Sequence, residues 1–233
     1  MGESLRAWSY VLARDLGIAP CADHGILTLC TCKPRIRAGA AVGDWVLATL
    51  PKRFGNGRVA YVGRVAERIE TGAYGDRYPN RPDALYERAA DGRLVHRGGD
   101  YHAEPELVRR DLGVNRCLRF EPFWYFGGAG PSLRESLLAL CHYHVGQAVR
   151  PLGADRFEAL QAWLAGWPHG VDGEPRERAS GEGYRARMAF LAEPRFAGPP
   201  PRERDPGSVR PGPGDAPRGA PRGGGPGRRP RGC

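Results

Sequence analysis

Residues 30 to 48, CTCKPRIRAGAAVGDWVLA, hold the side chains of this chain with the greatest potential for chemistry. Two cysteines one residue apart are followed by a lysine and two arginines. Nearby cations lower the pKa of a thiol and raise its nucleophilic thiolate fraction, which makes Cys32 a candidate nucleophile. A nucleophilic cysteine also needs a base, and no histidine lies close to Cys32 in the sequence. The carboxylates of Asp44 and Asp100 are the candidate general bases.

A zinc site is an alternative use of the same cysteines. Structural zinc ligands usually come in pairs with about two to four residues between them, whereas a single residue separates Cys30 from Cys32. The other cysteines and the histidines are scattered without a paired spacing, so we expect no metal. Cys30 is then a small buried hydrophobe. The sequence also lacks a glycine-rich phosphate loop between a strand and a helix, and we expect no cofactor.

Lys33, Arg35 and Arg37 form a basic segment interrupted by Pro34 and Ile36. Proline favours an extended conformation in the residue before it, and along an extended segment the three cations would face one way. Such a lip suits phosphate, because arginine offers a fork of donors and lysine a point charge. The alternative is a solvated edge strand whose charges prevent pairing with another sheet. The residues do not decide between the two.

Residues 71 to 115 are polar and predict a long ordered loop, which inside a domain is usually functional or disordered. A pocket lined from this loop would use arginine for phosphate and tyrosine to stack on a base. Phe120 and Trp124 are assigned to the core, and alternation would turn Tyr125 toward the pocket. The predicted nucleotide-binding residues are therefore Lys33, Arg35, Arg37, Arg77, Asp100, Tyr101 and Tyr125.

Apolar and β-branched runs bounded by glycine and proline predict five strands, at residues 7–13, 26–31, 44–50, 58–66 and 116–126. Asn56-Gly57 predicts a hairpin between the third and fourth of these. A capping box at Ser132 predicts one helix, and a second begins near Asp155 with an apolar stripe that includes Trp163. These elements predict an α+β domain, either a curved, mainly antiparallel sheet or a small β-barrel, with helices toward its C-terminal end.

The net charge of +9 comes from 35 basic and 26 acidic residues and is unevenly distributed. Residues 194–233 contain nine arginines and three acidic residues, so this Pro/Gly/Arg-rich tail carries +6 of the total. Its composition predicts disorder and sequence-independent attraction to nucleic acid. We therefore divide the chain into an α+β domain at 1–172, a poorly defined stretch at 173–193 that includes a short helix over 184–193, and the tail.

Two further features bear on location. The N-terminal residues lack the apolar region of a secretory signal, and no apolar run approaches the ~20 residues of a membrane helix. We expect a cytoplasmic protein that does not associate with membranes, in which the six cysteines are mostly reduced thiols.

The runs SYVLARDLGIAP, TLCTCKPRIRAGAAVGDWVLAT and GRVAYVGRVAE, followed by DRYPNRP, GGDY and FWYFGG, resemble the nucleotide modification associated domain 2 family over about residues 8–168. The resemblance implies a partner that is nucleic acid or a nucleotide, and association with enzymes that modify nucleic acids. The positions that match family motif residues are Cys32, Lys33, Arg37, Asp44, Arg77 and Asp100.

The chain departs from that resemblance at two places. Relatives often carry a Gly-His pair near a helix end, where this chain has Gly146-Gln147, and an Asn where it has Tyr101. If that histidine is catalytic in relatives, this chain lacks it. The Gly-Asp-Trp entry to a strand is also similar to the small barrels of PUA and EVE domains, which implies a PUA-like barrel as a fold analogy.

Three functional hypotheses follow. The first, which the sequence favours, is a module that recognises a nucleotide or modified base through the basic lip and the polar pocket. The alternative is an enzyme that acts on nucleotides or nucleic-acid bases with Cys32 or a pocket carboxylate. In the third, the arginine-rich tail alone binds nucleic acid.

Overall fold

The computed structural model describes residues 5–144 and 146–177. The predicted helix at 184–193 and the tail from residue 194 lie outside this part of the chain. Among the described helices, none is both long and apolar enough to cross a membrane.

The strands of the structure include every one that the sequence predicts. In chain order they are β1 (Arg6–Val11), β2 (Leu27–Leu29), β3 (Trp45–Thr49), β4 (Val59–Ile69), β5 (Tyr86–Arg88), β6 (Leu94–His96), β7 (Cys117–Tyr125), β8 (Gln147–Pro151) and β9 (Gly170–Val171).

The helices are short. The α-helices are α1 (Pro34–Gly39), α2 (Thr71–Arg77), α3 (Pro105–Leu112) and α4 (Ala154–Leu164). The 3-10 helices are η1 (Asp23–Gly25), η2 (Lys52–Phe54), η3 (Gly127–Ala129) and η4 (Glu135–Leu140).

Seven strands form one mixed sheet in the order β2-β7-β4-β3-β1-β8, with β9 paired to β7. The pairs β1–β3 and β7–β9 are parallel, and the others are antiparallel. The predicted hairpin is confirmed, because β3 and β4 pair antiparallel with Trp45 opposite Arg64. The sheet is open over the described residues, so the curved-sheet alternative is right and the PUA-like barrel is not confirmed.

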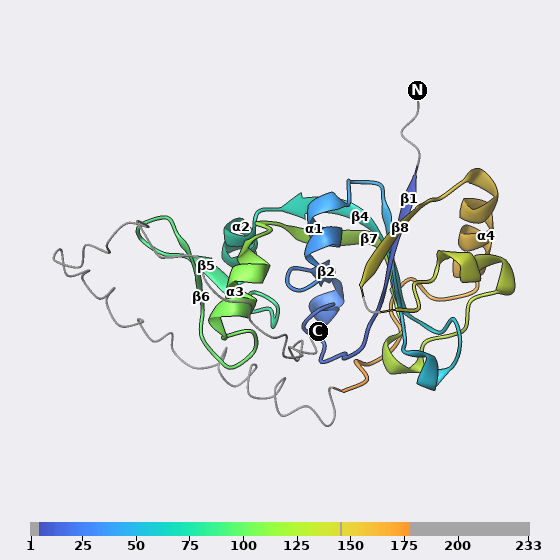
Figure 1. The fold of residues 1–233 in the computed structure, drawn as a ribbon, viewed down its shortest axis with the longest axis horizontal. Coiled ribbons are helices and arrows are strands. Elements are labelled where there is room, and N and C mark those ends of the chain that lie inside the picture. The colour runs from blue at the N-terminus through green and yellow to red at the C-terminus, as the bar shows by residue number, and fades with distance from the viewer. Residues whose placement is uncertain (1–4, 145, 178–233) are drawn as a thin grey trace, which may run out of the picture. The chain divides into compact units, whose positions relative to one another are not determined.

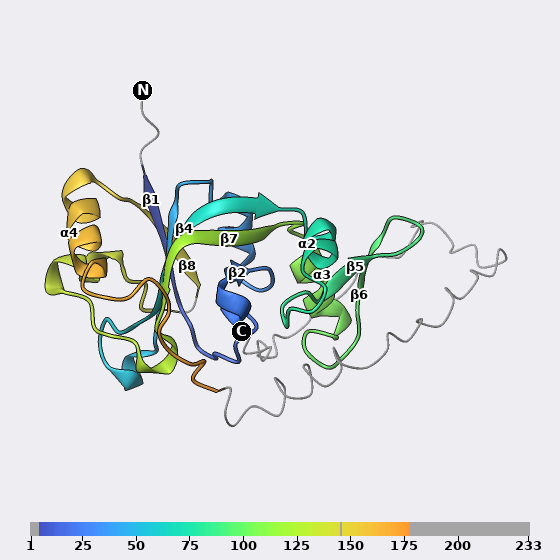
Figure 2. The ribbon, with the colours of Figure 1, turned by 180° about the vertical axis from the view of Figure 1, so that it is seen from behind.

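Both faces of this sheet are covered by other elements. Successive side chains of a strand point to opposite faces, and each set packs into a separate apolar cluster. Val46 and Ala48 of β3 pack with Ile36 of α1 in one apolar cluster. Trp45 and Leu47, the alternate residues, pack with α4 and η4 in another. Figures 1 and 2 show α1 and α4 on opposite sides of the central strands.

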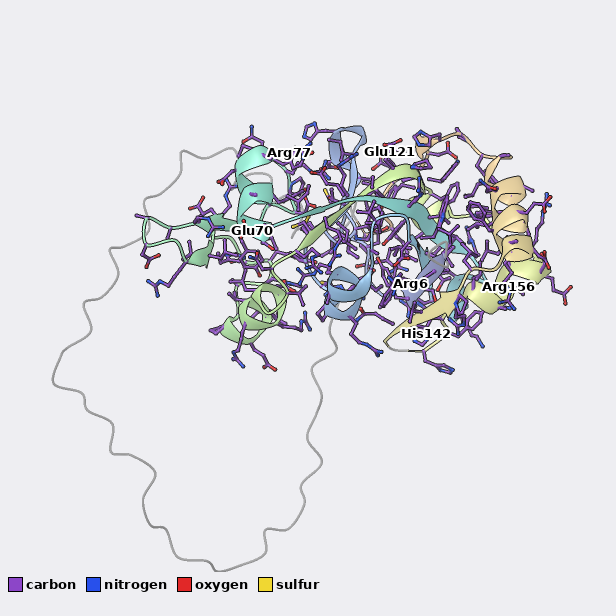
Figure 3. All side chains as sticks on the ribbon, turned by 90° about the horizontal axis from the view of Figure 1, so that it is seen from above. Arg6, Glu70, Arg77, Glu121, His142 and Arg156 are labelled. Carbon is purple, nitrogen blue, oxygen red and sulfur yellow. The ribbon has the colours of Figure 1, made fainter. Side chains whose placement is uncertain are left out.

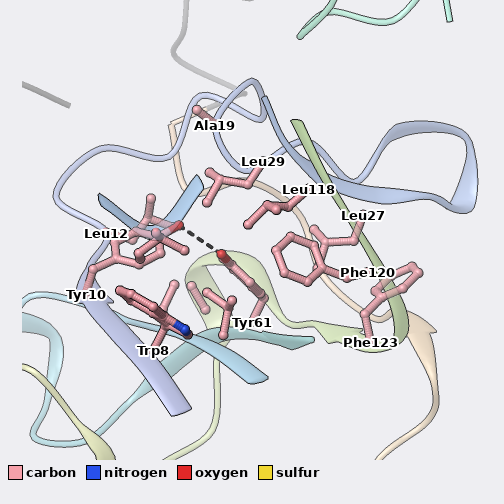
Figure 4. Packing of buried hydrophobic residues seen from close by; sticks show 14 of the residues in the cluster. Trp8, Tyr10, Leu12, Ala19, Leu27, Leu29, Tyr61, Leu118, Phe120 and Phe123 are labelled. Atoms are coloured by element: carbon pink, nitrogen blue, oxygen red, sulfur yellow. Dashed lines mark hydrogen bonds between the residues drawn. The ribbon is translucent and has the colours of Figure 1, made fainter. Parts of the chain in front are cut away.

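The α1 side of the core contains polar groups among its apolar ones. Tyr10 of β1 donates its hydroxyl to that of Tyr61 on β4 at 3.2 Å, and neither residue is exposed (Figure 4). Burial raises the pKa of both phenols, so both keep their protons at neutral pH. Phe120 packs against Tyr61 with ring centroids 5.8 Å apart, which confirms its predicted place in the core.

Asp44, directly before β3, joins the start of this strand to β1. Its carboxylate accepts hydrogen bonds from Arg6 at 2.7 Å, from the indole of Trp8 at 2.9 Å and from the backbone of Ala41 at 2.9 Å. Gly43 before it has φ +96°, a conformation that glycine adopts without strain. The Gly-Asp pair is therefore a structural turn in this chain.

The predicted loop over 71–115 is wrong, because this segment contains α2, the β5–β6 hairpin and α3. The sequence of α2 contains two glycines, Gly72 and Gly75, which disfavour a helix and leave no apolar stripe to predict one. A Cβ on Gly75 would lie 2.3 Å from the carbonyl oxygen of Tyr86, so the helix needs glycine to approach β5. Pro105 at the first turn of α3 is a helix-start signal.

The helix predicted at Ser132 is also wrong. Ser132 forms a β-bridge with Arg58, and the backbone N–H of Leu133 bonds to Gly57, so the chain is still extended at this point. Only the 3-10 turn η4 follows. The second predicted helix is confirmed as α4, which begins at Ala154, one residue before the predicted Asp155.

We predict that Asp44→Ala destabilises the fold by roughly 3 kcal/mol, since it leaves the buried Trp8 indole without its acceptor and Arg6 without its ion-pair partner. Urea unfolding measures this loss. Asp91→Ala, which removes an exposed pair with Arg93, is the matched control and should leave the urea midpoint unchanged. Equal midpoints for the two variants would contradict the structural role of Asp44.

Candidate functional site

Cys32 lies on a sharp turn between β2 and α1. Its φ is 56° and that of Lys33 is 40°, the left-handed region that non-glycine residues seldom occupy. Three features hold this conformation. The N–H of Cys32 donates to Asp111 at 3.0 Å, Pro34 begins α1, and the carbonyl of Lys33 accepts from two backbone N–H groups of that helix. Strain of this kind clusters at active sites and costs ~1–3 kcal/mol per residue.

His102 reaches Cys32 from the segment between β6 and α3. Its Nε2 lies 3.5 Å from the Sγ of Cys32, and its Nδ1 lies 2.5 Å from Oδ2 of Asp111. His102 also has a positive φ, of 57°. The Tyr101 ring lies parallel to the imidazole, with centroids 4.4 Å apart and an interplanar angle of 3°. The imidazole is therefore fixed on one face and at both nitrogens.

Asp111 of α3 is 1% exposed and binds several donors at once. The hydroxyl of Tyr86 donates to it at 3.2 Å, and the Arg37 guanidinium lies 3.8 Å away. Burial alone would raise the pKa of this carboxyl. The hydrogen bond of His102, the Arg37 charge and the Cys32 N–H outweigh burial, so the pKa is lowered. Asp111 is thus a carboxylate at neutral pH.

The ionised Asp111 determines which nitrogen of His102 carries the hydrogen. A carboxylate only accepts hydrogen bonds, so Nδ1 of His102 must be the donor in the 2.5 Å contact. In a neutral imidazole the other nitrogen then has a lone pair, and that nitrogen faces the Cys32 sulfur. The arrangement has the roles of a catalytic triad: nucleophile, base and orienting acid.

Arg37 is buried within this site, and the predicted lip is wrong. Residues 34–39 form α1 instead of an extended segment, so the three cations do not project together. The Arg37 guanidinium is 0% exposed and donates to the carbonyl oxygens of Cys32, Asp111, Val114 and Arg116 at 2.8–2.9 Å. Its donors tie the turn at Cys32 to the end of α3.

Lys33 and Arg35 behave differently from Arg37. Lys33 is 8% exposed, and its ammonium lies 4.6 Å from the centre of the Tyr10 ring. Arg35 lies on the exposed side of α1. Near them, the side-chain oxygen of Gln147 accepts from the backbone of Ile36 at 2.9 Å. The imidazole beside Cys32 comes from His102.

The two predicted carboxylate bases are not in contact with Cys32. Asp44 is 5% exposed and accepts from the three donors described above. Asp100 is exposed and lies two residues before His102. Its neighbour Tyr101 stacks on the imidazole, so this part of the predicted pocket lies beside the thiol.

Arg77 and Tyr125 lie elsewhere. Arg77 is exposed on α2, pairs with Glu67 at 2.8 Å, and lies on a different part of the chain from Arg156 of α4 (Figure 3). Tyr125 is fully buried and donates its hydroxyl to Asp15 at 2.9 Å. Burial raises the pKa of Asp15 above its usual range. Tyr125 thus lies in the core and not on an open pocket wall.

His102 and Asp111 are the residues that sequence reasoning missed. They lie 70 and 79 positions from Cys32, on a segment predicted to be a loop. Their only local signals are the Gly-Gly-Asp-Tyr run before His102 and the proline that begins α3. Within residues 5–144 and 146–177, no three His, Cys, Asp or Glu side chains are grouped so that they could hold a metal ion. Cys30 is 1% exposed in an apolar cluster, as predicted.

Comparison with known proteins gives one match. The family model described as nucleotide modification associated domain 2 matches residues 4–182, a range that contains Cys32, His102 and Asp111. No curated protein and no solved structure matches the chain.

The lowered pKa of Asp111 predicts how its contribution to stability depends on pH. The carboxylate stabilises the folded protein fully above its unfolded pKa of ~3.9, and this contribution is lost as pH falls through the lower folded pKa. Asp111→Asn should therefore cost about 3 kcal/mol at neutral pH and progressively less in more acidic solution. Urea unfolding over a pH series measures the difference. A difference that stays constant into strongly acidic solution would contradict this account.

Proposed function

The chain belongs to the nucleotide modification associated domain 2 family, and on this premise we propose that it is a thiol-dependent enzyme acting on nucleotides or nucleic-acid bases. Cys32 is the nucleophile, His102 the general base and Asp111 the residue that orients His102. One observation carries this proposal: the Sγ–Nε2 contact of 3.5 Å is continued by the Nδ1–Oδ2 contact of 2.5 Å.

The local conformation supports a catalytic role over a packing role. A cysteine that only fills space needs neither a left-handed backbone nor an imidazole partner, as Cys30 illustrates two residues away. At Cys32, Lys33 and His102 the backbone is held in a region that costs energy. Arg37 and Asp111 provide the bonds that offset this cost.

The reaction class that fits these groups is acyl transfer at an amide or ester carbonyl. The Cys32 thiol gives its proton to Nε2 of His102 while sulfur bonds to the carbonyl carbon, and the C=O electron pair moves to oxygen. When the C=O bond re-forms, the bond to the leaving amine or alkoxide breaks, and that group takes the proton from His102. Water then attacks the thioester carbon while His102 takes one of its protons, the C–S bond breaks to release the carboxylic acid, and that proton passes from His102 to sulfur.

The predicted binding residues beside this centre provide the nucleotide contacts of the proposal. Lys33 follows the nucleophile directly, and Tyr101 stacks on the base His102. Arg35 and Asp100 are exposed near them in sequence. We assign the phosphate to Lys33 and Arg35, and the hydrogen-bond donors of a nucleobase to Asp100.

Arg37 distinguishes catalysis from a pure recognition module, because its guanidinium donors are used inside the protein and not on a ligand. A phosphate-binding lip needs exposed guanidinium donors, whereas those of Arg37 bond to four carbonyl oxygens. Arg77 lies on α2 with Glu67, and Tyr125 in the core with Asp15. The geometry therefore favours catalysis at Cys32 over a binding surface built from all seven predicted residues.

Thiol alkylation tests the triad without knowledge of the substrate. We predict that iodoacetamide modifies Cys32, which is 1% exposed, faster than the other cysteines that the structure describes, and that His102→Ala slows this modification at neutral pH by at least roughly tenfold, because the imidazole no longer accepts the thiol proton. Intact-mass spectrometry follows the reaction, and Cys32→Ser identifies its fast phase. Cys141→Ser, at a cysteine far from His102 in the fold, is the matched control. Equal rates in wild type and His102→Ala would overturn the triad.

Turnover of an acylated base tests the reaction class. With N4-acetylcytidine 5′-monophosphate as the probe, we expect an acetylated form of the wild-type protein in the intact-mass spectrum and release of the deacetylated nucleotide. Asp111→Asn should lower kcat by roughly 100-fold or more, because the imidazole is no longer oriented. Lys33→Ala should raise KM for the monophosphate but not for the unphosphorylated nucleoside. Turnover that persists in Cys32→Ser would contradict the proposal.

A further inference from the structure

A cavity lies on the face of the sheet opposite Cys32. It has a volume of about 470 Å³ and contains few polar groups. We propose that this cavity binds a nucleobase of a single-stranded nucleic acid, with Arg64 on an adjoining phosphate. The ligand class rests on the proposed function, whereas the cavity itself does not.

Rigid elements form the cavity walls. Trp45 of β3 and Arg64 of β4 are register partners in the sheet, Trp124 comes from β7, and Phe157 and Gln161 come from α4. Sites built on strands and helices keep their geometry better than sites on loops. The volume lies within the range of small-molecule pockets, ~300–1,000 Å³.

The aromatic side chains present a stacking surface. Trp45 and Trp124 stack with centroids 6.4 Å apart and an interplanar angle of 22°, and Phe157 is tilted against Trp45 at 6.0 Å. The Trp124 ring is only half-buried, so part of it faces the cavity. Base stacking on an aromatic ring contributes ~1–3 kcal/mol and accepts every base.

Other contacts hold the Trp124 ring in place before any ligand arrives. Its indole N–H donates to the carbonyl oxygen of Trp167 at 3.3 Å, and His169 meets its ring edge-on at 5.4 Å. A ring fixed in this way loses little side-chain entropy on binding. The sequence predicted Trp124 in the core, but the structure places it half-buried at the cavity. The apolar pattern does not distinguish a fully buried tryptophan from a half-buried one.

The polar side chains of the cavity have donors to spare. Arg64 is exposed and makes no hydrogen bond or ion pair with any residue that the structure describes, and neither does the Gln161 side chain. By contrast, Arg119, on β7 of the same sheet, pairs with Glu67. A guanidinium fork suits phosphate, and an amide both donates to and accepts from a base edge.

Trp45 adds an independent observation. Its indole N–H is buried and has no acceptor among the described residues. Buried donors are nearly always satisfied in native proteins. A phenylalanine at position 45 would also fill the core and would bury no unsatisfied N–H group. The presence of tryptophan therefore points to a role of the indole surface in the cavity.

The location of the cavity defines the substrate class further. Trp45 and Val46 point to opposite faces of β3, and Cys32 packs on the Val46 face. One nucleotide cannot occupy both faces at once. The base in this cavity therefore belongs to a different nucleotide from the one that reaches Cys32, and we infer that the substrate is a polymer.

Fluorescence anisotropy of the full chain with a labelled oligothymidine of about 12 nucleotides tests the inference. Trp124→Ala should weaken binding roughly tenfold, and Trp124→Phe, which keeps a ring, should recover most of it. Arg64→Ala should reduce the slope of log K against log salt by about one. Arg68→Ala, at an exposed arginine on the same strand, is the matched control and should leave binding unchanged.

Cys32→Ala separates this inference from the proposed function. It should bind oligothymidine like wild type, while Trp124→Ala should keep the fast alkylation of Cys32. Loss of alkylation in Trp124→Ala would reveal a folding defect, in which case Trp124→Phe and Arg64→Ala decide. Wild-type affinity in both Trp124→Ala and Arg64→Ala would overturn the inference. So would an absence of oligothymidine binding by the wild-type chain.

Discussion

The carboxylate of Asp111 is the group on which the candidate site depends. It accepts the backbone N–H of Cys32, the imidazole of His102 and the hydroxyl of Tyr86, and it lies beside the guanidinium of Arg37. These groups come from the turn after β2, the segment after β6, β5 and α1, so one buried charge on α3 joins four separate segments. A buried carboxylate is costly unless donors surround it, and the same donors that offset this cost also position the thiol and its base.

Arg37 shows how strongly the backbone constrains this region. Arg37 ends a run of three alternating basic residues, the pattern of a solvated face, yet its side chain enters the protein and donates to four carbonyl oxygens. The short helix α1 turns Arg37 inward and Arg35 outward, because residues two apart on a helix do not share a face. Without Arg37 each of these four carbonyl oxygens would lose a donor, and the left-handed turn at Cys32 would lose one of its supports.

Much of the sheet could be predicted from the sequence, because alternation and turn residues act locally. The β3–β4 hairpin and the α4 stripe are examples. The site could not be predicted in full. Cys32 and its neighbouring cations are visible in the chain, but His102 joins them only through a contact across 70 residues, which no local pattern encodes. Ser132 failed as a helix start for a similar reason, since its strand-like pairing with Arg58 is tertiary and outweighs the capping pattern.

The sheet separates two environments, with a thiol, an imidazole and a carboxylate on the α1 side and an aromatic cavity on the α4 side. The central claim concerns the first of these: Asp111 accepts the Nδ1 hydrogen of His102 and so presents Nε2 to Cys32. Proton NMR of the His102 imidazole tests it most directly. The account predicts a strongly hydrogen-bonded, low-field Nδ1 proton that is retained in Cys32→Ala and lost in Asp111→Ala. A spectrum in which Asp111→Ala keeps that resonance, or in which the wild-type protein lacks it, would contradict the account.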